Sequence, residues 1–178
     1  MIPTGKTLDV LYSEDDIATR VQAMGREITE ANEGRELTVV AVLKGSFLFV
    51  ADLVRAIDLP VTIDFLGMSS YGESTESSGV VKITQDLSMS ITDRHVLIVE
   101  DIVDTGLTMR YLLDNLETRR PASVQICTLL HKPANQRCEV PIEYTGFVIE
   151  DRFVIGYGLD LAEHFRNLPY IAHLRDTE

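Results

Sequence analysis

An uncharged apolar run at residues 96–99, Val-Leu-Ile-Val, is followed directly by two acids and then by a short polar loop. Four consecutive residues of this kind predict a strand buried on both faces, as at the centre of a parallel sheet covered by helices. The acids Glu100 and Asp101 would then lie at the carboxyl end of that strand, where open α/β sheets bind ligands. The run therefore predicts an α/β fold with its functional site at one edge of the sheet.

The loop after the acids, residues 104–108, reads Asp-Thr-Gly-Leu-Thr and precedes an expected helix at residues 109–116. Its glycine lets the chain approach a ligand closely. The unpaired N–H groups at the start of a helix, together with the helix dipole, favour a bound anion. The combination of acids and amide-lined turn indicates a site for a sugar phosphate.

The rest of the chain has the pattern of repeated βαβ units. Ser13 and the three acids after it predict a helix start, and apolar residues then recur at helical spacing as far as Gly34. Ser46 is expected to cap a second helix whose apolar face consists of Phe47, Val50, Val54 and Ile57. Strands are expected at residues 37–43, 61–66, 123–130, 146–149, 152–157 and 170–174, with a helical turn before the last of them.

Length and composition fit one domain that spans residues 1–178. The chain is 45% hydrophobic, and no Pro/Gly-rich linker divides it. No segment resembles a signal peptide or a membrane span, so we expect a soluble, cytoplasmic protein with no membrane partner. The only cysteines, Cys127 and Cys138, form neither a metal-binding pair nor a disulfide framework, and the four histidines show no ligand spacing.

The net charge of −12, from 16 Lys and Arg against 28 Asp and Glu, argues against a nucleic-acid partner. It also means that the overall field repels an anionic ligand. A phosphorylated ligand would have to be held by close-range amides, a few placed cations and a divalent metal.

Two other functional classes fit the sequence poorly. Gly156-Tyr157-Gly158 begins like a dinucleotide-binding motif, but the third glycine position is Leu161 and too little chain follows for a βαβ unit. Asp101 and Asp104 are separated by two residues, whereas the aspartyl-phosphatase pattern has one. The Gly-rich loop of the nucleoside triphosphatases is absent.

The stretch at residues 96–108 closely resembles the phosphoribosyl pyrophosphate motif of the purine phosphoribosyltransferases. The chain as a whole is similar to the bacterial hypoxanthine (hypoxanthine-guanine) phosphoribosyltransferases from about Leu37 to Arg166. Further matching segments lie in order at residues 43–46, 69–72, 130–133 and 153–160. The resemblance implies a type I phosphoribosyltransferase fold, with a mostly parallel central sheet flanked by helices. It also implies a small hood formed by the terminal segments and a mobile lid loop at about residues 69–80.

The resemblance implies a role for each matching residue around the ribose and the phosphates. Glu100 and Asp101 would bind the ribose hydroxyls and a metal ion, with Asp160 as a second metal-binding carboxylate. Asp104 would be the general base that accepts the N7 proton of the purine. The 5′-phosphate would bind Thr105, Gly106, Leu107 and Thr108, and pyrophosphate would bind Lys44, Gly45 and Arg166. In the family the peptide bond that enters the lysine can be cis.

The resemblance also implies how the base is recognised. Lys132 would donate to the 6-oxo group of the purine, Phe153 would stack on the ring, and the backbone of Val154 would contact the base edge. Adenine presents an amino donor at that position, so a buried ammonium would be left unpaired. Ser70 and Tyr71 match the start of the lid that excludes water from the reacting centre.

The function implied is purine salvage with Mg²⁺ as cofactor: transfer of 5-phosphoribosyl from phosphoribosyl pyrophosphate to N9 of hypoxanthine or guanine. A homodimer or homotetramer is implied as well. Two alternatives remain open from the sequence. One is a non-catalytic, RNA-binding regulator with the same fold, which would need a basic face. The other is a phosphoribosyltransferase for another base, such as xanthine or a pyrimidine.

Overall fold

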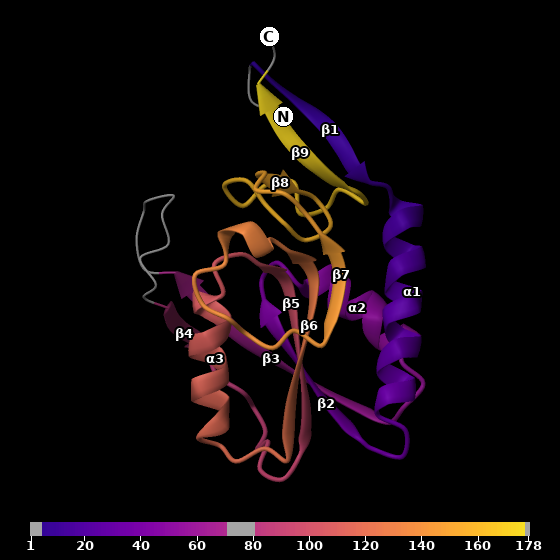
Figure 1. The fold of residues 1–178 in the computed structure, drawn as a ribbon, viewed down its shortest axis with the longest axis vertical. Coiled ribbons are helices and arrows are strands. Elements are labelled where there is room, and N and C mark those ends of the chain that lie inside the picture. Colours follow the sequence, from indigo (N-terminus) through magenta and orange to yellow (C-terminus); the bar gives the residue numbers. More distant parts are fainter. Residues whose placement is uncertain (1–4, 71–80, 177–178) are drawn as a thin grey trace.

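The computed structural model describes residues 5–70 and 81–176 of the chain (Figure 1). Within these residues the main sheet has six strands in the order β4-β3-β2-β5-β6-β7. Strands β3, β2, β5, β6 and β7 are parallel, and β4 runs antiparallel to β3. The strands are β2 (Leu37–Leu43), β3 (Val61–Ser70), β4 (Val81–Gln85), β5 (His95–Val103), β6 (Ser123–His131) and β7 (Tyr144–Val148).

A small second sheet lies beyond the carboxyl ends of the parallel strands (Figure 1). It is antiparallel in the order β1-β9-β8, formed by β1 (Lys6–Tyr12), β9 (Ile171–Asp176) and β8 (Val154–Ile155). The long segment between β8 and β9 therefore lies above the edge of the main sheet where the site is expected. We call the second sheet, together with this segment, the hood.

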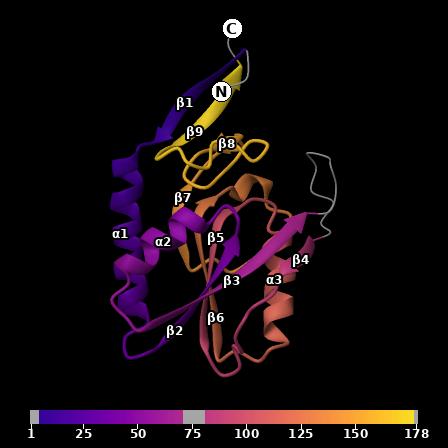
Figure 2. The same ribbon diagram turned by 180° about the vertical axis from the view of Figure 1, so that it is seen from behind.

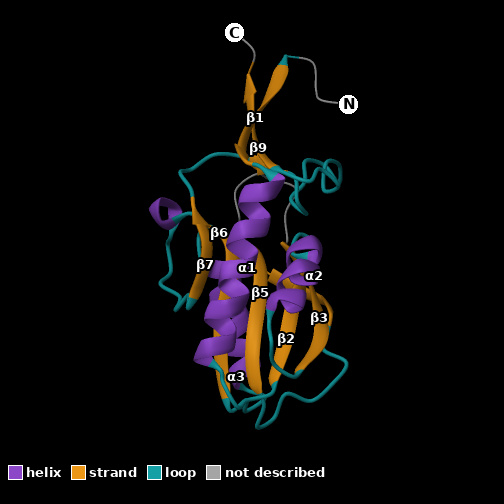
Figure 3. Ribbon diagram, turned by 90° about the vertical axis from the view of Figure 1, so that its right-hand side faces the viewer, coloured by secondary structure: helices purple, strands orange, loops and turns teal. Residues whose placement is uncertain are grey.

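Helices cover both faces of the main sheet, as its uninterrupted apolar strands require. Helices α1 (Glu14–Ala31) and α2 (Phe47–Ala56) lie on one face, and α3 (Leu107–Glu117) lies on the other (Figures 2 and 3). A short 3₁₀ helix, η1 (Pro133–Asn135), follows β6. The α/β class with a mostly parallel sheet, predicted from the sequence, is confirmed.

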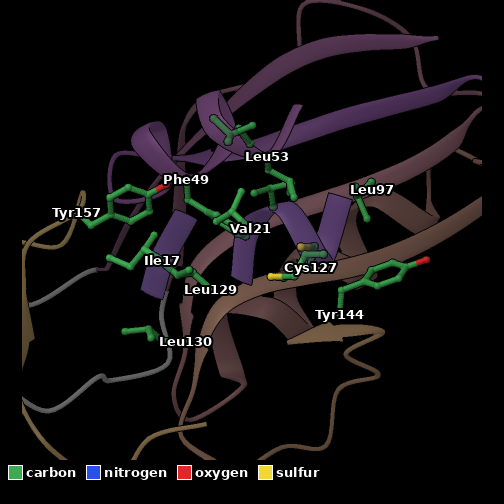
Figure 4. Packing of buried hydrophobic residues seen from close by; sticks show 14 of the residues in the cluster. Ile17, Val21, Phe49, Leu53, Leu97, Cys127, Leu129, Leu130, Tyr144 and Tyr157 are labelled. Carbon is green, nitrogen blue, oxygen red and sulfur yellow. The ribbon is translucent and has the colours of Figure 1, made fainter. Parts of the chain in front are cut away.

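Each face has its own apolar core. Under α1 and α2, Ile17 and Val21 pack with Phe49 and Leu53 against Leu97 of the central strand (Figure 4). Under α3, Leu112 and Leu116 pack against the alternate side chains of β2 and β5. The alternation explains why residues 96–99 are all buried: their side chains enter the two cores in turn. In the part of the chain that the structure describes, no helix is long and apolar enough to cross a membrane.

The helix signals in the sequence are correct in place but not in every detail. Ser13 and Asp16 form a reciprocal capping box at the start of α1. Ser46 occupies the N-cap of α2, but its hydroxyl donates to the carbonyl of Val42 (2.6 Å) and caps no N–H group. Phe47, expected on the apolar face of α2, is 40% exposed, and Phe49 is the phenylalanine of this helix that is buried.

Several expected boundaries also differ. Strand β5 continues to Val103, so Glu100 and Asp101 lie within its last four residues and not after it. The strand is longer than expected because β6 continues to pair with it as far as Val103. Strand β3 continues to Ser70 because β4 pairs with its end. The predicted helical turn before the last strand was wrong: residues 156–170 form turns joined by isolated bridges at Gly156–Leu159 and Leu161–His164.

Gly25 marks a tight contact between α1 and α2, where a Cβ atom would lie 2.5 Å from the carbonyl oxygen of Ala56. Alanine favours a helix over glycine by about 1 kcal/mol, but overpacking costs about 1–3 kcal/mol. Because the obstructing atoms include backbone, we expect Gly25→Ala to lower the free energy of unfolding by about 1–2 kcal/mol in urea denaturation. Arg26→Ala, on the exposed face, should change it by less than about 0.5 kcal/mol. A gain in stability on Gly25→Ala would contradict the prediction.

Candidate active site

The carboxyl end of the main sheet borders a cavity of about 720 Å³. Strand β5 contributes Glu100 and Asp101 to its lining, the β2–α2 loop contributes Lys44 and Gly45, and the hood contributes a group of charged side chains. A second hollow of about 290 Å³ adjoins it at Glu100 and is lined by residues 102–106. The parallel strands thus deliver side chains from distant parts of the sequence to a single edge.

Glu100 and Asp101 are two adjacent carboxylates with little to neutralise them. The pKa of Glu100 is raised well above its usual value, first by burial and then by the neighbouring negative charge of Asp101. Burial also raises the pKa of Asp101, although the N–H of Ile102 donates to one of its oxygens (2.9 Å). Among the described residues no hydrogen-bond partner reaches the buried Oε2 of Glu100. An electrostatic arrangement of this kind is typical of a binding site for cations or hydroxyl donors.

The loop at residues 104–108 is shaped by glycine and by a neighbouring segment. Gly106, the N-cap of α3, has a φ of 79°, and a Cβ atom there would lie 2.3 Å from the carbonyl oxygen of Cys138. The carbonyl of Thr105 accepts hydrogen bonds from the N–H groups of Arg137 (2.9 Å) and Cys138 (3.2 Å). The loop is therefore braced from outside, and the N–H of Leu107 at the start of α3 donates to the hydroxyl of Thr105 (3.4 Å). Sequence reasoning missed this brace, because nothing in residues 136–138 marks it.

Asp104, which lines the second hollow, lies beside Lys132. The ammonium of Lys132 lies 3.9 Å from Oδ2 of Asp104 and 3.4 Å from Oδ1 of Asp151, and the lysine is only 7% exposed. Oδ1 of Asp104 is buried, and no group in the described residues donates to it. A hydrogen bond from the N–H of Lys132 to the carbonyl of Val103 (2.9 Å) fixes the lysine beside the end of β5. Asp151 was not singled out in the sequence; only the fold brings it to Lys132.

The expected base-contacting residues, Phe153 and Val154, closely follow Asp151, the partner of Lys132, in the chain. Phe153 is 51% exposed, and its carbonyl accepts hydrogen bonds from the N–H of Leu174 (3.2 Å) and from the ring of His173 (2.9 Å). Val154 is buried in the short strand β8. The exposed ring and the buried neighbour are consistent with one residue stacking on a ligand and the other contributing backbone.

Three chain segments meet tightly at Gly45. A Cβ atom on Gly45 would lie 1.6 Å from Oδ2 of Asp101, and a Cβ atom on Gly158 would lie 1.9 Å from the carbonyl oxygen of Gly45. The peptide bond between Leu43 and Lys44 is cis. The β2–α2 loop therefore packs against the carboxylate of Asp101 through Gly45, and the hood packs against the backbone of that loop through Gly158.

The hood contributes a charged cluster around Arg166. Its guanidinium contacts Oδ1 of Asp160 (2.9 Å) and Oε2 of Glu163 (3.4 Å), and it donates to the carbonyl of Gly158 (2.8 Å). Glu163 also contacts the ammonium of Lys44 (2.9 Å), which lowers the pKa of the Glu163 carboxyl. The sequence analysis identified Lys44, Asp160 and Arg166 but missed Glu163.

Tyr157 attaches the hood to the rest of the fold. Its hydroxyl donates to Oδ2 of Asp52 on α2 (2.5 Å), and burial raises the pKa of the tyrosine. This contact, absent from the sequence analysis, fixes the segment that carries Gly158 and Asp160.

The expected lid is only partly within the described chain. Ser70 ends β3 and pairs with Val81 in the ladder, whereas Tyr71 and the remainder of the expected lid, residues 71–80, lie outside the described residues.

Comparisons with known proteins agree with this geometry. Residues 8–162 match the phosphoribosyl transferase domain family. The chain is 50% identical over 167 residues to the hypoxanthine phosphoribosyltransferase of Haemophilus influenzae, covering 92% of this chain and 93% of that protein. It is 48% identical over 166 residues to the bifunctional protein TilS/HprT of Listeria monocytogenes, covering 93% of this chain but 26% of that protein. The chain thus spans about a quarter of the length of these bifunctional relatives.

Among solved structures, a hypoxanthine-guanine phosphoribosyltransferase from Bacillus anthracis superposes with a TM-score of 0.89 at 47% identity, covering 93% of this chain and 97% of that chain. The type I phosphoribosyltransferase fold implied by the sequence is thereby confirmed. Both the domain match and the extent of these identities show that the chain belongs to the phosphoribosyltransferase family, among its hypoxanthine and hypoxanthine-guanine phosphoribosyltransferases.

Proposed function

We propose that this protein transfers the 5-phosphoribosyl group of phosphoribosyl pyrophosphate to N9 of hypoxanthine or guanine in cytoplasmic purine salvage, releasing pyrophosphate. The observation that carries the proposal is the convergence on one sheet edge of a carboxylate with a free oxygen, Asp104, a buried ammonium, Lys132, and the amide-lined turn between them and α3. This combination provides a proton acceptor, a donor for a 6-oxo group and a phosphate-binding loop.

Glu100 and Asp101 bind the ribose in this proposal. A carboxylate accepts strong, charge-assisted hydrogen bonds from hydroxyl groups, and these two lie at the floor of the cavity beside the phosphate loop. The turn at residues 105–108 holds the 5′-phosphate through its backbone N–H groups. Leu107 offers no side-chain donor, so its contribution to binding is through its backbone.

Mg²⁺ fits the donor set at the same place. In the described residues no three His, Cys, Asp or Glu side chains come together to hold a metal ion by themselves. Magnesium commonly uses one or two protein carboxylates and completes its shell with substrate phosphates and water. Glu100, Asp101 and Asp160 are the proposed ligands, of which one or two at a time would hold the ion together with the substrate. When bound, Mg²⁺ would supply positive charge that stabilises the departing pyrophosphate.

Asp104 moves the proton. The C1′–O bond to pyrophosphate breaks with its electron pair going to the leaving group, while N9 of the purine forms the new bond to C1′. Oδ1 of Asp104 accepts the proton from N7, which leaves the product base neutral. Lys44, Gly45 and Arg166 orient the pyrophosphate, and most of the rate enhancement comes from such pre-oriented charge.

Lys132 selects the base. Its ammonium is almost fully buried and already lies beside two carboxylates, so a 6-oxo acceptor adds a further hydrogen bond, whereas the 6-amino group of adenine would place a donor against a donor. Phe153 stacks on the ring, and the backbone of Val154 contacts its edge. We also propose a homodimer or homotetramer, which the family resemblance supports. The RNA-binding alternative lacks support in a chain of net charge −12.

Replacement of Asp104 by Asn tests the proton-transfer step. The amide side chain keeps the shape of the loop but cannot accept the N7 proton, so we expect kcat for hypoxanthine to fall by roughly 10²- to 10⁴-fold. Binding of phosphoribosyl pyrophosphate, measured by calorimetry, should change little. The matched control is Asp114→Asn, which removes an exposed carboxylate from α3 and should leave turnover unchanged. Unaltered turnover in the Asp104→Asn variant would refute the assigned role.

Replacement of Lys132 by Gln tests base selection. We expect kcat/KM for hypoxanthine to fall at least about tenfold, and the preference over adenine to narrow, since a neutral amide can face either base. KM for phosphoribosyl pyrophosphate should stay near its wild-type value. An assay that offers hypoxanthine, guanine, xanthine and adenine with Mg²⁺ measures both quantities and separates the alternative base specificities. Retention of full discrimination in the variant would contradict the assignment.

Glu100→Gln tests the electrostatic cost of the carboxylate pair. Because the folded-state pKa of Glu100 is raised, the stability of the metal-free protein should fall as the pH rises from the pKa of the unfolded side chain to that of the folded one, and this group should cause no further change above it. At neutral pH the free energy of unfolding should therefore be about 1–2 kcal/mol higher in the variant than in the wild type. The variant should nevertheless lose activity. Below about pH 4, where the unfolded side chain is protonated as well, the difference should vanish. Urea denaturation with a chelator present, repeated across pH, checks both expectations; a variant less stable at neutral pH would contradict them.

A further inference from the structure

Glu163 contacts both of the cations that are assigned to pyrophosphate. Its carboxylate lies 2.9 Å from the ammonium of Lys44 and 3.4 Å from the guanidinium of Arg166. The two cations come from different parts of the fold, one from the β2–α2 loop and one from the hood, and Glu163 joins them. Its Oε2 atom makes both contacts.

The hood segment is folded so that this carboxylate reaches the cavity. Ala162 and Glu163 have positive φ angles of 51° and 65°, and the N–H of Glu163 donates to Oδ2 of Asp160 (2.8 Å). Glu163 lines the same cavity of about 720 Å³ as Lys44 and Arg166. An anion supplied by the protein therefore occupies the position between two cations where a bound anion would be expected.

Resting on the function proposed above, we propose that Glu163 is a positioning residue: it binds Lys44 and Arg166 as an internal anion while the pyrophosphate subsite is empty, and the pyrophosphate group displaces it. When substrate binds, its pyrophosphate group replaces the Glu163 carboxylate as the anion that contacts the two cations. Two long cationic side chains are kept near their bound positions, which reduces the ordering they need when substrate arrives.

The strengths of the contacts suit such an exchange. Glu163 is 64% exposed and Lys44 is 68% exposed, and ion pairs of this kind are weak. A pyrophosphate group carries several negative charges and competes well against a single carboxylate. Arg166 also contacts Asp160 and the carbonyl of Gly158, so it stays in place when Glu163 withdraws. After the reaction, Glu163 competes for the same cations and assists release of pyrophosphate.

Glu163→Gln tests the exchange directly. The variant keeps the length of the side chain and a hydrogen-bonding group but removes the competing charge. We expect calorimetry with pyrophosphate and Mg²⁺, without purine, to show roughly threefold to tenfold tighter binding than wild type. The matched control is Glu36→Gln. Glu36 lies just before β2, at the opposite end of the sheet, and its carboxylate has a similar exposure and pairs with Arg94. This substitution should not alter the affinity.

Steady-state kinetics distinguish an exchanging anion from a merely structural residue. The Glu163→Gln variant should show a lower KM for phosphoribosyl pyrophosphate and stronger product inhibition by pyrophosphate, and Glu163→Asp should restore values towards wild type. Weaker or unchanged pyrophosphate binding in Glu163→Gln, in a variant that melts like wild type, would overturn the proposal.

A structure of the wild-type protein with pyrophosphate and Mg²⁺ gives a test that needs no variant. Lys44 and Arg166 should contact pyrophosphate, and Glu163 should have left both; persistence of the two Glu163 contacts with pyrophosphate bound would overturn the exchange. Failure of the wild-type protein to transfer phosphoribosyl to any purine would instead refute the proposed function. If the wild-type enzyme is active and the Glu163→Gln variant binds pyrophosphate with unchanged affinity, only the role of Glu163 is refuted.

Discussion

Two like-charged, poorly solvated carboxylates at the end of β5 are the constraint on which the arrangement of the site depends. Burial raises the pKa of both Glu100 and Asp101, and the neighbouring charge of Asp101 raises the pKa of Glu100 further. Within the described chain, the fold does not relieve the repulsion with a lysine or arginine in direct contact with the pair. Glu100 and Asp101 instead lie in a central strand of the main sheet, between two apolar cores. The burial of these cores offsets the destabilising effect of the two carboxylates.

Backbone contacts keep this unfavourable pair from rearranging. Gly45 packs on the carboxylate of Asp101, and Gly158 packs on Gly45, with no room for a side chain at either contact. The Tyr157–Asp52 hydrogen bond then attaches the same hood segment to α2. The acids, the β2–α2 loop and the hood therefore form one packed unit, in which a displacement of any one part would force the other two to shift.

The sequence predicts best what is determined locally. The bounds of β2 and the helix start at Ser13 follow from apolar runs and capping residues, and the structure has them where they were expected. The site edge could be located for the same reason, because the acids and the glycine turn are contiguous with a buried strand. The hood could not be derived from the residues themselves: β8 has two residues, and residues 156–170 owe their turns to positive φ angles and tertiary contacts. Asp151 and Glu163 lie in such segments, and only the fold brings them to Lys132, Lys44 and Arg166.

The charges of the site explain how an acidic protein can bind an anion. Lys44 contacts Glu163, Arg166 contacts Asp160 and Glu163, and Lys132 lies between Asp104 and Asp151, so each of these three cations already has a carboxylate beside it. In the exchange proposed above, an incoming pyrophosphate group takes the place of Glu163 beside Lys44 and Arg166. A ligand with a single charge gains little from that exchange, because it replaces a tethered carboxylate with an untethered one. A ligand that carries several charges on one rigid group, and brings a divalent cation to Glu100 and Asp101, relieves the repulsion of the acids as it replaces the internal anions. On the proposed function, the balance of charges within the site favours a substrate that bears a polyphosphate, and binding it requires no positive field from the protein as a whole.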